Sequence, residues 1–307
     1  AADGGKGFSA NGDIVVSGGN FTINTAGNGA NYTNTLGTAD SYSTAGFSTD
    51  TNVNISGGTF TLTNTGLNGK NISADLNITV SGTAQITAAN SGNSGKCIKA
   101  DGNILFNGGS TTLNVSGTTV LTASGSGFDP SYPTGIKATG TLTINSGIVT
   151  VTGTSTATGT KGLSADGAIT INGGTVSSTT AGNGAVYTGT TGVADSYSSA
   201  AIATDNNIVI SGGTVTTNSS GTGGKGLKAD GSITIGTSTS SPTLNITTTG
   251  ARFLVSGTDY NHPKTIVANG TVTINNGTNT INSTDDGVHS DTAIVVTGGS
   301  TVINAIS

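Results

Sequence analysis

A short phrase of about six residues recurs along the whole chain and limits what the chain can fold into. Clear copies are Lys6–Gly12 (Lys-Gly-Phe-Ser-Ala-Asn-Gly), Lys161–Gly167 and Lys225–Gly231. Ten copies, some looser, end at positions 11, 50, 75, 101, 139, 166, 205, 230, 269 and 291. Internal repeats of this kind are typical of solenoids, in which each repeat buries its apolar face only against its neighbours.

Each copy is followed by an alternating strand, a turn and a second alternating strand. Residues 168–174, for example, read Ala-Ile-Thr-Ile-Asn-Gly-Gly. A period of two predicts that Ile169 and Ile171 point inward, and within the phrase it predicts the same for Leu163 and Ala165. We therefore expect three short strands, joined at Gly or Asp corners, in each coil.

The spacing of the copies sets the size of the coil. Steps between the closing positions are 39, 25, 26, 38, 27, 39, 25, 39 and 22 residues, so a coil of about 25 residues is interrupted by inserts of about 14. The inserts fall just before a copy, near residues 27–45, 124–134, 182–200 and 250–264. This pattern predicts an all-β, single-stranded parallel β-helix of about ten coils, right-handed by the crossover rule.

A longer repeat lies over the short one. Residues 27–59 match residues 182–214 at 22 of 33 positions. We interpret the chain as one β-solenoid domain over residues 1–307, built by duplication of a unit that covers about residues 1–155 and again about residues 156–307.

Composition excludes several classes of function. Only 8% of the residues are charged and the net charge is −5, which argues against a nucleic-acid partner because such partners select clustered Lys and Arg. No apolar run is long enough to span a membrane. The chain begins Ala-Ala-Asp, which we interpret as a processed or partial chain. Cys97 is the only cysteine, so no intrachain disulfide forms, and we expect it to be an incidental surface thiol.

The aspartates that close the copies are candidate metal ligands. Stacking in register would align them about 4.8 Å apart, where carboxylates repel one another but can share a Ca²⁺ ion. A second acidic patch lies near the C-terminal end of the sequence. The candidate Ca²⁺ ligands in the two groups are Asp50, Asp75, Asp101, Asp166, Asp205, Asp230, Asp285, Asp286 and Asp291. The alternative is that Asp caps the amides of the corner and is neutralised by the first lysine of each phrase. Those lysines are Lys6, Lys70, Lys96, Lys161 and Lys225.

The inserts carry every tyrosine of the chain. Loops on a rigid scaffold are common binding sites, and an aromatic ring with a polar tip suits the face of a sugar ring. The candidate carbohydrate-binding residues are Tyr32, Tyr42, Tyr132, Tyr187, Tyr197 and Tyr260. The alternative is that each tyrosine packs its own insert against the solenoid wall.

Other functions have weaker support. The outward threonines of residues 59–63 predict flat ranks, which occur on ice-binding solenoids and on any β face that must stay soluble without charge. No nucleophile elbow, phosphate loop or pair of glutamates is present. Asp285, Asp286 and His289 resemble a glycosidase carboxylate pair with a histidine, but basic substrate clamps are missing, and a polysaccharide lyase would need a base beside a calcium cluster. We therefore expect no enzyme.

Two sequence motifs resemble a known bacterial family. Residues 225–235 (Lys-Gly-Leu-Lys-Ala-Asp-Gly-Ser-Ile-Thr-Ile) and 285–291 (Asp-Asp-Gly-Val-His-Ser-Asp) are similar to those of secreted carbohydrate-binding proteins with a polysaccharide-lyase-like right-handed β-helix. The resemblance implies structural calcium along the helix and binding of cellulose or acidic plant polysaccharide without cleavage. The residues that match the family's motif positions are Asp166, Asp230, Asp285, Asp286 and Asp291.

The sequence leaves two functions open. The first is a calcium-stabilised, non-catalytic polysaccharide-binding protein, secreted or attached to the cell surface. The second is a structural subunit of an extracellular filament or matrix, because neither end shows a polar or helical cap and unpaired strand edges would let copies stack head to tail. Ends that continue into further sequence are the simpler explanation of the missing caps.

Overall fold

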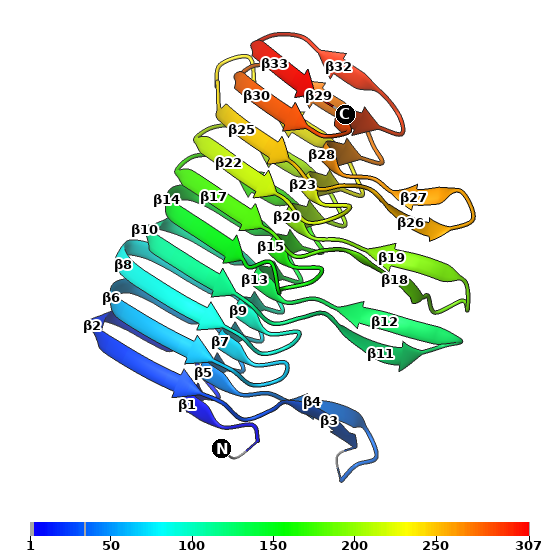
Figure 1. Cartoon of the computed structure of the whole chain (residues 1–307). Helices are drawn as coiled ribbons and strands as arrows, with labels where there is room; N and C mark the ends of the chain where they lie inside the picture. Colours follow the sequence, from blue (N-terminus) through cyan, green and yellow to red (C-terminus); the bar gives the residue numbers. More distant parts are fainter. Residues whose placement is uncertain (1–2, 34, 307) are drawn as a thin grey trace.

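The protein is built from parallel β-strands. A computed structural model describes residues 3–33 and 35–306, and no helix occurs in this part of the chain, so it offers no helix that could cross a membrane. A ten-stranded sheet and a fifteen-stranded sheet carry the core, and four two-stranded antiparallel hairpins project from them (Figure 1). The all-β prediction is confirmed.

Every copy of the phrase forms one strand of the ten-stranded sheet. Each strand between the two outermost ones pairs in parallel with the copies before and after it, as in Leu163 opposite Ile136 and Ile202. In spatial order the strands are β1 (Lys6–Ala10), β5 (Ala45–Thr49), β7 (Lys70–Ala74), β9 (Lys96–Ala100), β13 (Thr134–Ala138), β15 (Lys161–Ala165), β20 (Ala200–Thr204), β23 (Lys225–Ala229), β28 (Lys264–Ala268) and β31 (Asp286–Ser290). We call each of these strands, with the strand or strands of the larger sheet that follow it in the chain, a layer.

The fifteen-stranded sheet differs between the two halves of the chain. In the first five layers it contributes one long strand, namely β2 (Ile14–Thr25), β6 (Val53–Asn64), β8 (Ile78–Asn90), β10 (Ile104–Val115) and β14 (Leu142–Gly153). In the last five layers it contributes two short strands, namely β16 (Ile169–Ile171) and β17 (Thr175–Thr180), β21 (Ile208–Ile210) and β22 (Thr214–Ser219), β24 (Ile233–Ile235) and β25 (Thr243–Thr248), β29 (Val272–Ile274) and β30 (Thr278–Ser283), and β32 (Ile294–Val296) and β33 (Ser300–Ala305).

Three short strands per layer are therefore found only in the second half. Both halves turn on a glycine with positive φ, such as Gly58 (φ 94°) and Gly174 (φ 78°), because a residue with a Cβ rarely adopts this conformation. In the first half the second and third strands merge through this corner, and the pairing between layers shifts register there.

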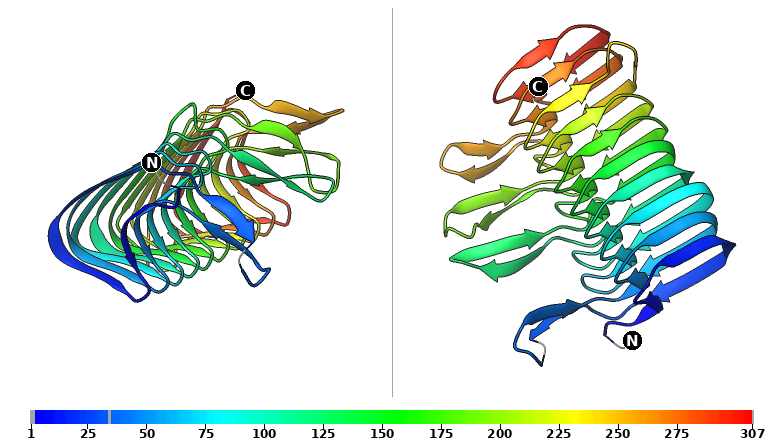
Figure 2. Two further views of the ribbon diagram at one scale, coloured as in Figure 1. Left: turned by 90° about the horizontal axis from the view of Figure 1, so that it is seen from below. Right: turned by 180° about the vertical axis from the view of Figure 1, so that it is seen from behind.

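The four hairpins leave the layers at the same corner. They are β3 (Ala30–Thr33) with β4 (Ala39–Tyr42), β11 (Val120–Ser124) with β12 (Gly127–Ser131), β18 (Ala185–Thr188) with β19 (Ala194–Tyr197), and β26 (Phe253–Ser256) with β27 (Asp259–Asn261). Each comes immediately before a strand of the ten-stranded sheet, and all four project from the same side of the molecule (Figure 2).

The core consists of apolar side chains stacked from layer to layer. Leu163, Ala165, Ile169 and Ile171 are all buried, which confirms the inward positions predicted from the alternation. In the first layers the stack is aromatic. The parallel rings of Phe8 and Phe47 have centroids 5.0 Å apart, and those of Phe21 and Phe60 have centroids 4.9 Å apart.

The prediction for Cys97 is wrong. Its side chain is fully buried, its thiol points toward the Asn114 carbonyl at 3.5 Å, and burial raises its pKa to about 12. Alternation fails at this position because each phrase strand starts at a corner, so its second and third residues both face the interior, as Cys97 and Ile98 do. Most layers have glycine there; a Cβ on Gly162 would lie 1.9 Å from Ser178 Oγ.

Candidate functional site

The outward side of the ten-stranded sheet, which we call the phrase face, carries most of the charged side chains discussed below. In β7, β9, β15 and β28 the first and fourth residues are less buried than their neighbours. In β15, for example, Lys161 and Ser164 flank buried Gly162 and Leu163. The residue that closes the phrase follows directly at the corner. Parallel pairing in register therefore stacks each of these positions into a column.

The closing aspartates stack as the repeat predicts. The Asp75 amide donates a hydrogen bond to the Thr49 carbonyl, and the Asp101 amide donates one to the Ala74 carbonyl, both at 3.0 Å. The same contact recurs in the other layers, so the closing column runs Asn11, Asp50, Asp75, Asp101, Thr139, Asp166, Asp205, Asp230, Asn269 and Asp291.

Side chains at the fourth position of the phrase contact four of these aspartates, three through lysine and one through histidine. The pairs are Lys99 with Asp101, Lys137 with Asp166, Lys228 with Asp230 at 2.7 Å, and His289 with Asp291 at 3.1 Å. The alternative expected the first lysine of the phrase to neutralise these aspartates. Within residues 3–33 and 35–306, no ion pair with aspartate is formed by Lys6, Lys70, Lys96, Lys161 or Lys225.

Two aspartates of the closing column that form no ion pair within the described residues have raised pKa values. Burial, followed by the charges of Asp101 and Asp50, raises the pKa of Asp75. Burial and the charge of Asp166 in the neighbouring layer likewise raise the pKa of Asp205. The column therefore disfavours ionisation at these two positions.

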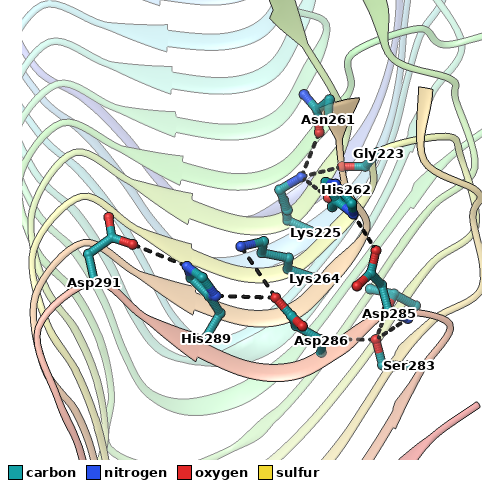
Figure 3. Close-up of polar contacts among 11 residues, drawn as sticks. Gly223, Lys225, Asn261, His262, Lys264, Ser283, Asp285, Asp286, His289 and Asp291 are labelled. Carbon is teal, nitrogen blue, oxygen red and sulfur yellow. Dashed lines mark hydrogen bonds and ion pairs between the residues drawn. The ribbon is translucent and has the colours of Figure 1, made fainter. Parts of the chain in front are cut away.

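The acidic patch in the last layer does not converge on one point. Figure 3 shows Asp285 turned toward His262, with Oδ2 and Nδ1 2.5 Å apart. The adjacent carboxylate of Asp286 lies instead 3.4 Å from Lys264 Nζ and 3.2 Å from His289 Nδ1. Each carboxylate therefore has its own basic neighbour, and the two do not face a shared space as a glycosidase pair does.

The described residues do not gather the ligands of a metal centre. Nowhere in that part of the chain do three His, Cys, Asp or Glu side chains come together so that they could hold an ion. The ion pairs above place amines and imidazoles where a cation would sit, so the aspartates do not fit a calcium site formed by three carboxylates. Calcium binding by these residues stays a prediction.

The first lysines of the phrase bind the bases of the hairpins. Lys70 Nζ donates to Ser43 Oγ at 2.7 Å, and Lys161 Nζ donates to the Ser198 carbonyl at 2.6 Å. The corresponding bonds in two other layers are Lys96 Nζ to Ser131 Oγ at 3.2 Å, and Lys225 Nζ to Asn261 Oδ1 at 2.8 Å and to the His262 carbonyl at 2.5 Å (Figure 3). We call Lys70, Lys96, Lys161 and Lys225 the clamp lysines.

Burial makes the clamp lysines weak cations. It lowers the pKa of Lys70 to about 8, and that of Lys96, Lys161 and Lys225 to about 7. Neighbouring lysines lower these pKa values further, because like charges disfavour protonation.

The six tyrosines form three groups on the hairpins. Tyr32 and Tyr42 lie 5.9 Å apart on the first hairpin. Tyr197 lies 6.0 Å from both Tyr132 and Tyr187, so this group joins the second and third hairpins. The fourth hairpin carries Tyr260.

Several tyrosines also have polar neighbours. The Tyr187 hydroxyl donates to Asp195 at 2.8 Å, and this bond together with burial raises its pKa to about 12. Lys161 Nζ lies 4.6 Å from the ring centre of Tyr132. Arg252 lies 4.5 Å from the ring centre of Tyr260, and such a cation stabilises an aromatic face.

Three hollows lie between the hairpins and the phrase face, and each is lined by one tyrosine. The first hollow, of about 230 Å³, contains Tyr42. The second, of about 470 Å³, contains Tyr132, and the third, of about 330 Å³, contains Tyr260. Their described linings do not include Tyr32, Tyr187 or Tyr197.

A larger hollow of about 550 Å³ lies between the last hairpin and the last layer. Arg252, His262 and Asp285 line it. It differs from the other three hollows in that its described lining residues include no tyrosine.

The contacts of the clamp lysines with the hairpins were not predicted, although the sequence carries a signal for them. Copies of the phrase that follow a hairpin begin with Ala45, Thr134 or Ala200, with Lys264 as the exception. The clamp lysines begin copies that do not follow a hairpin. A long side chain fits there because no hairpin crosses that corner, and its amine reaches a hairpin in the adjacent layers.

Comparison with known proteins identifies a family. The family model described as carbohydrate-binding domain-containing protein matches residues 1–92 and 203–306, which exclude the second and third hairpins. Neither the curated proteins nor the solved structures include a match. Because the matched residues make up more than half of the chain, the chain belongs to the family of carbohydrate-binding domain-containing proteins.

Proposed function

We propose that this protein binds a polysaccharide without cleaving it, along the three hollows between the hairpins and the phrase face. Membership of a carbohydrate-binding family is the observation that carries the proposal. Cellulose and acidic plant polysaccharides are the candidate ligands, as the sequence resemblance implies.

The arrangement of the hollows supports a linear polymer rather than a single sugar. The first hollow is lined from β7 and β9, the second from β9 to β20, and the third from β23 and β28. Together they extend from the third to the ninth layer, and at about 4.8 Å per layer this is roughly 30 Å. Such a length accommodates several consecutive sugar units.

The chemistry of the lining also suits sugars. Each hollow combines one tyrosine with several hydroxyl, amide or amine groups. In the first hollow these groups belong to Ser41, Ser43, Asn68, Lys70, Lys96, Lys99, Thr122 and Ser131. A ring that covers the C–H surface of a sugar, with polar groups around it, gives both affinity and orientation.

Retention on insoluble polysaccharides tests this proposal. Replacing Tyr42, Tyr132 or Tyr260 with Ala should weaken binding, since losing the burial of part of a ring costs about 1–2 kcal/mol, a roughly 5–30-fold loss. Phe128→Ala is the matched control, because Phe128 is an exposed aromatic on β12 that is absent from the described lining of the hollows. Unchanged retention of all three tyrosine variants would contradict the proposal.

Absence of cleavage is part of the same proposal. The divergent contacts of Asp285 and Asp286 support it, because one carboxylate contacts His262 and the other contacts Lys264. Prolonged incubation with each bound polysaccharide should release no new reducing ends and no unsaturated products. Release that is lost in Asp286→Asn would show an enzyme instead.

Calcium stabilisation is a separate proposal, which we limit to Asp50 and Asp75. These neighbours in the closing column have no ion pair within the described residues. Burial and the repulsion from Asp101 and Asp50 raise the pKa of Asp75, and a divalent cation would offset both with help from corner carbonyls. Added CaCl₂ should raise the melting temperature of the native protein but not that of Asp75→Asn. An equal response of both proteins would refute it.

We further propose that the protein is secreted or attached to the cell surface and that it winds as a right-handed parallel β-helix of about ten coils. The class of ligand supports the location. The hand is supported by the strong preference of parallel crossover connections for right-handed winding. Cell fractionation tests the first statement, and an experimental density map tests the second.

End-to-end self-association is a second candidate function. The outermost strands β1 and β31 each pair with only one neighbour in their sheet, and apolar side chains are exposed near both ends, among them Phe8, Val15, Ile294 and Val296. Such edges can pair with another copy. Sedimentation at increasing protein concentration should reveal growing rods, and a constant monomer would exclude this function.

A further inference from the structure

The first hollow differs in charge from its neighbours. It lies between the first two hairpins and the phrase face, and its three charged lining residues are all cationic: Lys70, Lys96 and Lys99. No acidic residue is among the described residues that line it. This concentration of positive charge stands out in a chain whose net charge is −5.

The second hollow provides the contrast. Lys96 lines it as well, together with Lys137 and Lys161, but Asp129, Asp166 and Asp205 lie in the same lining. The charges of the second hollow therefore balance, whereas those of the first do not.

Two amines of the first hollow have only neutral partners within the described residues. Lys70 Nζ donates to Ser43 Oγ at 2.7 Å. Lys96 Nζ donates to the Ser94 carbonyl at 2.9 Å and to Ser131 Oγ at 3.2 Å. These bonds orient the amines without supplying a counter-charge.

The third amine is shared with a carboxylate outside the lining. Lys99 Nζ pairs with Asp101, and both side chains are partly exposed. An exposed pair of this kind is weak, so a bound anion can compete for the amine.

Burial makes the lack of a counter-anion costly. Removal from water, followed by repulsion from Lys99, lowers the pKa of Lys70 to about 8. Removal from water, followed by repulsion from Lys70 and Lys99, lowers the pKa of Lys96 to about 7. An anion in the hollow would offset both effects, because it restores the charge neutrality that burial requires.

We propose that the first hollow binds an anionic substituent of a sugar, a carboxylate or a sulfate, through Lys70, Lys96 and Lys99. A volume of about 230 Å³ is below the roughly 300–1,000 Å³ of pockets that enclose a drug-sized ligand, so it takes one sugar unit or its substituent. Tyr42 lies in the same lining, where its ring can contact the sugar that bears the anion. The inference rests on the proposed polysaccharide binding and adds an acidic residue of the polymer as the feature recognised at this position.

The first test compares polymers that share a backbone and differ in charge. We expect the native protein to bind polygalacturonate at least about tenfold more tightly than its methyl ester, because charge-assisted hydrogen bonds are stronger than neutral ones. Added salt should reduce this difference. Equal affinity for the two polymers, together with equal affinity for dextran sulfate and dextran, would overturn the inference and leave the proposed function standing. Binding to none of these four polymers, nor to any other neutral glucan, would reject both.

Variants locate the anion. Lys99→Gln should lower the affinity for polygalacturonate by about tenfold and leave that for the methyl ester unchanged. Lys228→Gln is the matched control, because Lys228 occupies the same phrase position and pairs with Asp230 as Lys99 pairs with Asp101, yet it is outside the described lining of the hollows. An equal loss in both variants would place the effect in the overall charge and refute the site.

A sulfated polymer decides the source of the anion. The hollow is assigned to sulfate esters if the native protein binds polygalacturonate and its methyl ester equally but prefers dextran sulfate to dextran. The Lys99→Gln variant should then lose the preference for dextran sulfate. Lys70→Gln, verified as folded by its circular dichroism spectrum, should behave like Lys99→Gln. A folded Lys70→Gln protein with undiminished preference for both anionic polymers would contradict the site.

Discussion

Replacing a clamp lysine should change how stability depends on pH. The amine of Lys161 donates to the Ser198 carbonyl at 2.6 Å beneath the third hairpin, and burial lowers its pKa to about 7. In the unfolded chain the same amine has the ordinary lysine pKa, about 10.4. Between these two values the unfolded chain holds a proton that the folded chain has released.

The sign and size of the effect follow from this difference. Because the unfolded state binds more protons in this window, the free energy of unfolding rises with pH, by at most about 1.4 kcal/mol per unit for one lysine. From about pH 7 to about pH 10 the limit is about 4 kcal/mol for Lys161. The Ser198 carbonyl and the Tyr132 ring both favour the cation, so we expect a gain of about 2–4 kcal/mol.

Lys161→Met should remove this gain. Near pH 7 the variant should be more stable than the native protein by about 2–4 kcal/mol, because its side chain has no proton to release on folding. Near pH 10 the two proteins should have similar stability, because this penalty has gone and the hydrogen bond of the amine contributes only about 1 kcal/mol. Denaturant unfolding followed by circular dichroism at several pH values measures the slope.

Lys137→Met is the control for this experiment. Its amine pairs with Asp166 on the phrase face, so its replacement should leave the slope of stability against pH between 7 and 10 unchanged. Parallel curves for the native protein and a folded Lys161→Met would refute the reasoning, because they would mean that the buried amine stays protonated throughout this range.

Three further predictions concern the core. Phe47→Ala should lower the free energy of unfolding by about 3–5 kcal/mol, because a fully buried ring leaves a cavity that the stacked layers cannot close; an effect below 1 kcal/mol would be inconsistent with this packing. Gly162→Ala should markedly lower the melting temperature, since its Cβ would meet Ser178 Oγ, whereas Gly12→Ala, with open space around it, should not. Cys97 should react with a thiol reagent only as fast as the protein unfolds, and rapid labelling of the native protein would contradict its burial.

The sequence was sufficient to predict the parts of the fold that follow from periodicity. Alternation fixes which side of a strand faces the core, so the inward positions of Leu163 and Ile169 could be predicted without any knowledge of the third dimension. Stacking of the closing aspartates followed from the spacing of the copies, since coils of similar length stack in register. These features need only local geometry and repetition.

Other features depend on contacts between layers and could not be derived in this way. Cys97 was assigned to the surface because the alternation was extended to the start of the strand, where the corner turns two successive residues inward. Lys70 and Lys99 are both lysines of the phrase, yet one binds a hairpin and the other an aspartate. The difference arises from where the hairpins cross the corner, which the sequence indicates only through the residues that replace lysine there.

Placing every hairpin before a phrase strand has one consequence for recognition. The tyrosines and the clamp lysines are brought to the same edge of the phrase face, and the number of layers between hairpins sets the spacing of the hollows. The charged residues in the described lining of the first hollow are all lysines. The second and third hollows also contain aspartate, namely Asp129 in the second and Asp259 in the third. A polymer lying along this edge would therefore meet positions of different charge in a fixed order. On the proposed function, such an edge would distinguish polysaccharides by the position of acidic units along the polymer as well as by their composition.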